Sequence, residues 1–344
     1  AINALDIKED GIYVDMTLGY AGHAKEILKR NKKGFLFAFD KDVNAIECST
    51  KILQSIGSNF KIFNSDNSNA KEILENENVT GVDGILYDLG ISSPEIDEKD
   101  RGFSYMQDAK LDMRMDINQK LSAYEVVNNY KYEDLVRIFR IYGEERFAGK
   151  IAKNIEKARS IKPIKTTLEL VDIIDKSIPF KEKRNGHPAK RVFQAIRIEV
   201  NNEIEGLKKS LDNAVKLLNV NGILAVITFH SLEDRIVKQK FKELTEEDKF
   251  VKGLPNIDKS LLPDYVLITK KPILPSSDEI DFNKINDLFM QDEILLDKTS
   301  KSGKNTEKVD IKKNIIDFEI KQNVCVFHVT AGSVNNVNPN SLVE

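Results

Sequence analysis

Short apolar runs alternate with helical stretches through the first hundred residues of the chain. The apolar runs are bounded by polar residues and comprise 11–16, 34–39, 60–63 and 84–87. The intervening stretches carry apolar side chains at helical spacing and comprise 24–30, 43–56 and 70–77. Strands this apolar, separated by helices, are typical of a parallel sheet that is buried on both faces. The alternation therefore predicts a Rossmann-like α/β fold.

A helical region interrupts this alternation after the fourth apolar run. Residues 94–116 are polar and lack a clear period, whereas helical spacing covers 123–159, 166–177 and 191–218. An apolar run at 222–229 then indicates a fifth strand. We expect a mostly parallel sheet domain that is split by an inserted all-helical domain. The expected limits are 1–93 and 201–275 for the sheet domain, 94–200 for the insertion, and 276–344 for a divergent, partly disordered tail.

Three local patterns predict further details. Residues 265–270 have the composition of a strand, whereas 297–308 are polar and are expected to form a linker or a disordered stretch. The threonine pair Thr166 and Thr167 is expected to cap the helix over 166–177. Residues 1–5 have the spacing of a helix already under way, so we expect native residues to precede them.

Charge is distributed unevenly along the chain. The formal net charge of -3 argues against a protein that coats nucleic acid. Between Arg146 and Arg197, however, 14 Lys and Arg residues stand against 5 acidic ones. This segment fits either a phosphate-binding face or a pair of solvated helices.

Other features bear on location and on metal binding. The apolar runs are too short to span a bilayer, and no basic-then-apolar leader opens the chain, so we expect a cytoplasmic protein without a membrane partner. The two cysteines and four histidines are scattered and lack the spacing of a metal site. We therefore expect no metal.

A glycine-containing loop, V-D-M-T-L-G-Y-A-G-H-A, joins the first predicted strand to the first helix. Gly19 and Gly22 tolerate backbone angles that other residues resist, and they let a ligand approach the main chain. The spacing is not G-x-G-x-x-G and no Walker lysine follows, which disfavours a dinucleotide or a triphosphate. The loop alone fits a nucleoside ligand and a structural turn equally well.

Asp40 ends the second predicted strand, 18 residues after Gly22. An acid near this spacing accepts hydrogen bonds from ribose hydroxyls in this architecture. The loop and the acid together favour a nucleoside-containing cofactor, for which S-adenosylmethionine is the first candidate.

Two further motifs follow predicted strands. L-Y-D-L-G-I-S-S-P places Asp88 and Ser92 after the fourth strand, and I-T-F-H-S-L-E-D-R places His230 after the fifth. Carboxyl ends of parallel strands meet at one edge of the sheet, where ligands bind. We expect Asp88 to contact the cofactor or a substrate amine, and His230 to orient a substrate or bond the backbone. Alternatively, Asp88 caps a turn, and Glu233 and Asp234 only begin a helix.

The order of six motifs resembles that of the MraW family of ribosomal RNA small-subunit methyltransferases. The motifs are D-L-G-I-S-S-P-E-I-D, R-G-F-S-Y, L-D-M-R-M-D, Y-G-E-E-R-F-A, H-P-A-K-R-V-F-Q-A-I-R-I-E-V-N-N-E and F-H-S-L-E-D-R-I-V-K. The resemblance covers about residues 1–275, and the family's arginine-rich sequence is absent from 276–344. It implies methyl transfer from S-adenosylmethionine to N4 of a cytosine in 16S ribosomal RNA near the decoding centre. The implied partner is small-subunit RNA or the 30S particle, and a homodimer is left open.

The resemblance also implies cofactor contacts. The matching residues are Ala21, Gly22 and His23 in the family's Gly-Gly-His loop, Asp40 at the ribose, Asn67 at the adenine side, and Asp88. Glu95 stands where many members carry a cofactor-binding glutamine. Because Ala21 replaces a glycine, we expect a negative φ at this position.

The expected chemistry is direct methyl transfer, without a metal, to a positioned amine. Asp88 or a carbonyl near Leu89 would accept the proton, and Ser92 or His230 would orient the base. Four cations are expected to contact RNA phosphates, namely Arg101, Lys190, Arg191 and Arg197. The alternative is a helical cap that does not touch RNA.

Three other functions fit parts of these patterns. A nicotinamide-dependent oxidoreductase would share the fold, but the missing G-x-G-x-x-G argues against it. A methyltransferase for DNA or for a small molecule would use the same cofactor. An RNA-binding assembly factor without turnover would keep the fold and is compatible with Glu95.

Overall fold

The computed structural model describes residues 1–91, 101–185, 187–247, 262–269 and 271–273, together with four strand segments at 295–299, 306–310, 315–321 and 324–329. The chain divides into two compact units, residues 1–266 and 267–344, and each is described by itself. No helix within the described ranges is long and apolar enough to cross a membrane.

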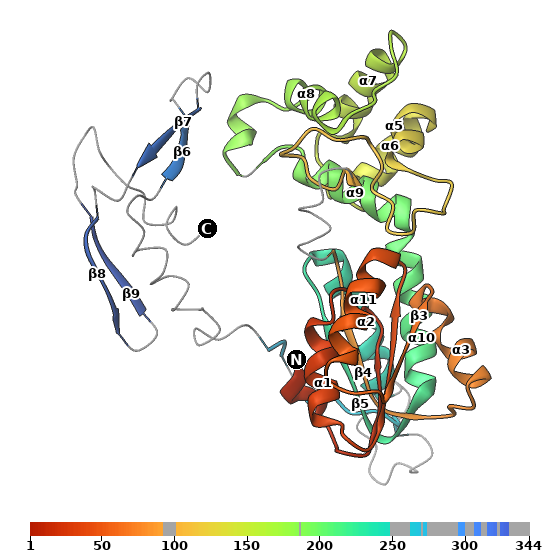
Figure 1. Cartoon of the computed structure of the whole chain (residues 1–344). Helices are drawn as coiled ribbons and strands as arrows, with labels where there is room; N and C mark the ends of the chain where they lie inside the picture. Colours follow the sequence, from red (N-terminus) through yellow and green to blue (C-terminus); the bar gives the residue numbers. More distant parts are fainter. Residues whose placement is uncertain are drawn as a thin grey trace. The chain divides into compact units, whose positions relative to one another are not determined.

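The first unit contains a five-stranded sheet in the order β3-β2-β1-β4-β5 (Figure 1). The strands are β1 (Ile12–Asp15), β2 (Phe35–Asp40), β3 (Phe60–Asn64), β4 (Val82–Asp88) and β5 (Leu218–Ile227). All four pairings are parallel. The predicted Rossmann-like α/β fold is thus confirmed, and β5 begins four residues earlier than the apolar run suggested.

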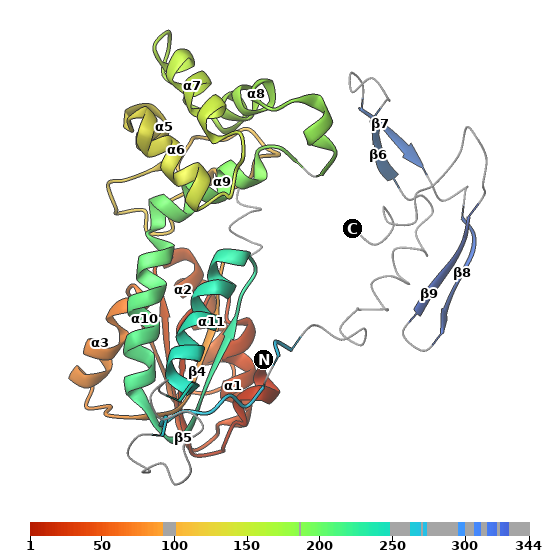
Figure 2. The ribbon, with the colours of Figure 1, turned by 180° about the vertical axis from the view of Figure 1, so that it is seen from behind.

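Helices cover both faces of the sheet, as Figures 1 and 2 show from opposite sides. They are α1 (Gly22–Arg30), α2 (Val43–Gln54), α3 (Ala70–Asn76), α10 (Glu203–Leu217) and α11 (Ser231–Thr245). Side chains alternate along a strand. Leu36 and Ala38 of β2 therefore join the core with α1 and α2, whereas Phe37 and Phe39 join the core with α3, α10 and α11.

The inserted helices pack around a separate core (Figure 1). They are α5 (Ala123–Asn129), α6 (Tyr132–Ile141), α7 (Ala148–Arg159), α8 (Thr167–Ser177) and α9 (Lys190–Asn201). Apolar side chains at helical spacing, such as Ile151 and Ile155, are fully buried in this core. Thr166 caps α8 and forms a capping box with Glu169, which confirms the predicted cap.

The helical region predicted over 191–218 contains two helices, because the chain breaks at Asn202. Asn202 has a φ of 51° and separates α9 from α10. Val192 and Ile196 of α9 belong to the core of the insertion, whereas Leu207 and Leu211 of α10 belong to the core of the sheet domain. Each helix thus buries its apolar side in a different core, and the break lies where the chain passes between them (Figure 2).

Two predictions for the C-terminal part are corrected. Residues 265–269, which were expected to form a strand, contain no regular secondary structure. Within 297–308, expected to be a linker, lie parts of β6 (Leu295–Thr299) and β7 (Thr306–Asp310), which pair antiparallel. A second antiparallel pair joins β8 (Ile315–Lys321) to β9 (Val324–Val329). Backbone pairing in a hairpin does not require an apolar sequence, which explains why composition missed β6 and β7.

Candidate functional site

The loop between β1 and α1 is held by hydrogen bonds from the neighbouring strands and helices. The Gly19 N–H donates to Asp40 Oδ2 at 2.7 Å, and the Ser49 hydroxyl donates to the Gly19 carbonyl at 2.7 Å. The Thr17 hydroxyl accepts the backbone N–H of Asp88 at 2.6 Å. The loop is therefore fixed to the carboxyl ends of both β2 and β4, the strands that flank β1.

Asp40, at the end of β2, supports this loop through both carboxylate oxygens. Oδ2 accepts the Gly19 N–H, and Oδ1 accepts the Asp42 N–H at 2.9 Å. Burial raises the pKa of Asp40, although these backbone donors act in the opposite direction. Each carboxylate oxygen has a second acceptor position. Asp40 is therefore able to accept hydroxyl groups of a ligand while it holds the loop.

Asp15, His23 and Asp88 meet beside the loop. His23 Nδ1 lies 3.2 Å from Asp88 Oδ2, and this hydrogen bond raises the pKa of His23 above its usual value despite partial burial. Asp15 is fully buried, and burial raises its pKa to about 6. Within the described residues, Asp15 Oδ2 and Asp88 Oδ1 are buried and accept no hydrogen bond. Buried acceptors without partners are costly in a folded chain, and they suit a ligand that brings its own donors.

The expectation of a negative φ at Ala21 is wrong. Ala21 is left-handed, with a φ of 60°, and Gly19 has a φ of 48°. A left-handed alanine costs about 1–2 kcal/mol. The Ala21 methyl is fully buried in the core that also contains Leu18 and Ala24, so burial offsets part of that cost. At Gly22, by contrast, an added Cβ would meet nothing within 4 Å, which leaves open space above the start of α1.

Asn67 lies in the short 3-10 turn η2 (Asn67–Asn69), which follows β3. Its side-chain amide donates to the Met16 carbonyl at 3.1 Å. Met16 directly follows β1, so the amide connects the end of β1 to the segment that follows β3. Asn67 is thus placed beside the loop, as Asp40 and Asp88 are.

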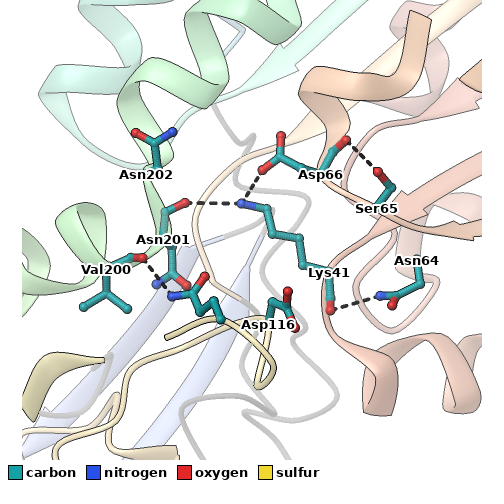
Figure 3. A pocket seen from close by; sticks show the side chains of 9 residues that line it. Lys41, Asn64, Ser65, Asp66, Asp116, Val200, Asn201 and Asn202 are labelled. Carbon is teal, nitrogen blue, oxygen red and sulfur yellow. Dashed lines mark hydrogen bonds and ion pairs between the residues drawn. The ribbon is translucent and has the colours of Figure 1, made fainter. Parts of the chain in front are cut away.

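A polar cavity of about 230 Å³ lies where the insertion joins the sheet domain (Figure 3). Its lining residues are Lys41, Asn64, Ser65, Asp66, Asp116, Gln119, Val200, Asn201 and Asn202. Lys41 crosses it, with its ammonium 2.5 Å from Asp66 Oδ2 and 3.2 Å from the Asn201 carbonyl. The cavity is therefore lined by side chains that already pair with one another.

His230 follows β5 and caps α11. Asp88 and Ile227 are partners in the pairing of β4 with β5, so the two motifs end side by side at one edge of the sheet. His230 Nδ1 accepts the Glu233 N–H at 3.4 Å, and Nε2 lies 3.1 Å from Glu233 Oε1. Glu233 and Asp234 occupy the first turn of α11. Here the structure agrees with the interpretation that these two acids begin a helix.

Glu203 joins His230 and Glu233 in a compact group. Ligand-type atoms of these three residues lie within 4.8 Å of one another, and the described ranges contain no other such group. Arg197 donates to both carboxylate oxygens of Glu203, at 2.9 Å each. One member of the group, Glu203, is thus already paired with a guanidinium.

Comparison with known proteins identifies the family of this chain. Residues 1–287 match the MraW methylase family. The chain belongs to the MraW methylase family. The match extends beyond residue 275, where the resemblance in sequence was expected to end.

One curated relative of this MraW family member is the ribosomal RNA small subunit methyltransferase H of Exiguobacterium sibiricum. The two chains are 53% identical over 285 residues, which cover 83% of this chain and 91% of the relative. Solved structures match more weakly. An rRNA methylase from Streptococcus thermophilus is 16% identical, with a TM-score of 0.23 over 32% of this chain and 64% of that one. NSun6 from Pyrococcus horikoshii is 15% identical, with a TM-score of 0.34 over 76% of this chain and 44% of that one.

The four cations expected to contact RNA fall into two pairs. Lys190 and Arg191 are exposed at the start of α9. Arg101 and Arg197 are mostly buried: Arg101 Nη1 lies 2.9 Å from Asp42 Oδ2, and Arg197 binds Glu203. We call the group Asp42, Arg101, Arg197 and Glu203 the junction, because its ion pairs lie where the insertion meets the sheet domain.

Two expected site residues, Ser92 and Glu95, lie outside the described residues. Two others were missed as site residues. Asp15 ends β1 as Asp40 ends β2, so its position at a strand end was a usable signal. Thr17 gave no such signal, because its role depends on the distance between its hydroxyl and the Asp88 N–H in the fold.

Proposed function

We propose that this MraW family member transfers a methyl group from S-adenosylmethionine to N4 of a cytosine in small-subunit ribosomal RNA. The observation that carries the proposal is a pair of buried oxygens beside the loop that precedes α1, Asp15 Oδ2 and Asp88 Oδ1, which accept no hydrogen bond from the part of the chain that the structure describes. The relative from Exiguobacterium sibiricum, whose name states small-subunit ribosomal RNA, supports this choice of substrate.

The described residues fit the proposed cofactor. Asp15 and Asp88 would accept its amino group, because both have buried oxygens in need of a donor. Asp40 would accept its ribose hydroxyls, and the open space at Gly22 would admit it close to the main chain. Asn67 is proposed to lie at the adenine side, and Glu95 remains a proposed contact. When bound, the cofactor supplies an electrophilic methyl group on a sulfonium.

The chain's own task is to hold the cytosine amine and to accept its proton. That amine is a weak nucleophile, so placement supplies much of the rate. Oδ2 of Asp88 already pairs with His23, so the proposed acceptor is Asp88 Oδ1 if Asp15 alone holds the cofactor's amino group, and the Leu89 carbonyl if Asp88 Oδ1 also binds that group. His230 would act indirectly: its ring caps α11 and thereby shapes the turn after β5. Ser92 remains a proposed base contact.

RNA phosphates are proposed to bind Lys190 and Arg191. Both side chains are exposed on the insertion, whose sequence is rich in cations. Arg101 and Arg197 are already paired with acids at the junction, so we propose that they keep the insertion in place for RNA to bind. The substrate form we propose is the 30S particle, and the proposed location is the cytoplasm.

The decisive experiment offers small-subunit particles from a strain that lacks the enzyme, with methyl-labelled S-adenosylmethionine, and identifies the labelled nucleoside by mass spectrometry. We expect N4-methylcytidine from the wild type, and about a 100-fold or greater loss of rate for Asp88→Asn. Asp234→Asn, an exposed acid of α11 paired with Lys238, is the control and should retain the rate.

The other outcomes separate the rival functions. Label in DNA or in a small molecule, but not in the particle, would assign those substrates instead. Binding of both the cofactor and the particle without any labelled product would indicate an assembly factor without turnover. Full activity of Asp88→Asn would remove Asp88 from the mechanism.

A further inference from the structure

Phe229 is an aromatic residue exposed at the edge of the sheet where the site lies. It follows β5 and is 70% exposed, whereas Phe37 and Phe39 of β2 are buried in the core. Its ring lies against Gly90: a Cβ added to Gly90 would be 3.3 Å from Phe229 Cδ2 and 3.9 Å from Cγ. Gly90 has a φ of 99°, so the backbone also disfavours a side chain there.

The ring lies close in the fold to the proposed proton acceptor. Asp88 pairs with Ile227 across β4 and β5, and the Leu89 N–H donates to the Ile227 carbonyl at 3.1 Å. Gly90 lies two residues after Asp88, and Phe229 lies two residues after Ile227. The exposed ring is therefore adjacent to the segment that carries Asp88 and the Leu89 carbonyl.

The backbone beneath the ring is firmly held. Glu233 is buried, and its Oε2 accepts the Phe229 N–H at 2.9 Å and the His230 N–H at 3.3 Å. His230 Nε2 lies 3.1 Å from the other carboxylate oxygen. Hydrogen bonding to His230 and Phe229 lowers the pKa of Glu233, although burial acts in the opposite direction. Phe229 is thus exposed on a turn whose backbone is held by hydrogen bonds.

We propose that the ring of Phe229 is the stacking surface for the nucleobase that receives the methyl group. This inference rests on the proposed function. A base reaches an enzyme site only after it leaves its own stack, and such bases commonly stack on aromatic side chains. A flat ring beside Gly90, where a side chain would crowd it, offers a free face to a base. Stacking would hold the exocyclic amine near Asp88 and the Leu89 carbonyl.

The first test compares Phe229→Ala, Phe229→Leu and Phe229→Tyr on small-subunit particles. Stacking is worth about 1–3 kcal/mol per base, so kcat/KM should fall roughly 5- to 150-fold for Ala. Leu keeps apolar bulk but lacks a ring, so it should behave like Ala. Tyr should remain near the wild type. Cofactor affinity by calorimetry should be unchanged in all three, because the ring is placed at the base and not at the loop.

Val220→Ala is the matched control, since Val220 is 91% exposed near the other end of β5. It should change neither kcat/KM nor cofactor affinity. Thermal unfolding of each variant checks that the fold is retained. Wild-type kcat/KM for both Phe229→Ala and Phe229→Leu would overturn the proposal.

A second test does not need turnover. An RNA fragment that carries a fluorescent cytosine analogue at the target position should be quenched by the wild type and by Phe229→Tyr, but not by Phe229→Leu. Quenching without methylation would retain the stacking surface and reject the proposed reaction. Methylation by the wild type, with equal quenching by Phe229→Leu, would reject the stacking surface alone. If Phe229 instead docks a protein, kcat/KM on particles would fall for Phe229→Leu but the quenching of the RNA fragment would not change, which also overturns the proposal.

Discussion

The acids of the loop region and those of the junction differ in how they are paired. Beside the loop, Asp15 and Asp88 each retain a buried oxygen that receives no hydrogen bond from the described residues. At the junction, Asp42 and Glu203 both bind arginines at 2.9 Å. Buried charges with good partners hold a structure together, whereas unpaired acceptors cost stability and persist where a ligand uses them. From this contrast we propose that Asp15 and Asp88 bind a ligand, whereas Asp42 and Glu203 hold the structure together.

The largest effect is expected at the junction. Arg101→Ala would leave the Asp42 carboxylate, 3% exposed, without its cation. Loss of one partner of a buried pair costs about 3–5 kcal/mol, and urea unfolding of the full chain measures it. Arg146→Ala is the control, because that side chain is 70% exposed and pairs with Glu182 at the surface. Exposed pairs contribute about 0–1 kcal/mol, so equal losses in the two variants would contradict the assignment.

Asp15→Asn should act in the opposite direction on stability. Because burial raises the pKa of Asp15 to about 6, the protonated carboxyl favours the folded state. The contribution of the protonated Asp15 to the free energy of unfolding is complete below about pH 4. It is lost as the pH rises through about 6. At pH 7.5 without cofactor, Asp15→Asn should raise the free energy of unfolding by about 2–3 kcal/mol, at about 1.4 kcal/mol per pKa unit.

Cofactor binding supplies the second measurement on the same variant. An asparagine offers one acceptor oxygen and no charge, so calorimetry should show weaker binding of S-adenosylmethionine. The gain in stability should grow between about pH 4 and 6 and then level off. A gain that does not depend on pH would mean that the titration of Asp15 is not its source.

Charge reversal on the insertion tests whether its exposed cations, unlike the paired arginines of the junction, bind RNA phosphates. Lys190→Glu with Arg191→Glu should weaken RNA binding and reduce the salt slope, log K against log salt, by about 2 if both contact phosphates. Filter binding at several salt concentrations measures the slope. Lys208→Glu with Lys209→Glu is the matched control, an exposed pair on α10 outside the insertion. An equal effect of both double variants would indicate non-specific attraction only.

The smallest effect is expected at the break between α9 and α10. Asn202 is exposed with a φ of 51°. Asn202→Ala should destabilise the chain by about 1 kcal/mol, because alanine resists the left-handed region. Asn202→Gly should keep the free energy of unfolding near that of the wild type, since glycine adopts the left-handed conformation freely. Equal unfolding midpoints in urea for the two variants would mean that the break is not held by this conformation.

Local pattern was sufficient for part of the site. Strand ends placed Asp40 and Asp88 correctly at one edge of the sheet, because parallel strands with crossover helices all expose the same ends there. The break at Asn202 was missed, because apolar spacing continues through it and no glycine or proline marks it. The sign of φ at Ala21 was also missed, since a buried methyl offsets the backbone cost in a way that sequence does not display.

The sequence by itself determined the class of fold, the interruption by helices and the family, since these depend on periodicity and on ordered motifs. Only the tertiary structure decided which charged side chains form ion pairs that stabilise the fold. Arg101 pairs with Asp42, 59 positions away, whereas no donor among the described residues reaches the second oxygen of Asp15. Pairing depends on distances in space and on the exclusion of water, and neither is a property of the chain read in order.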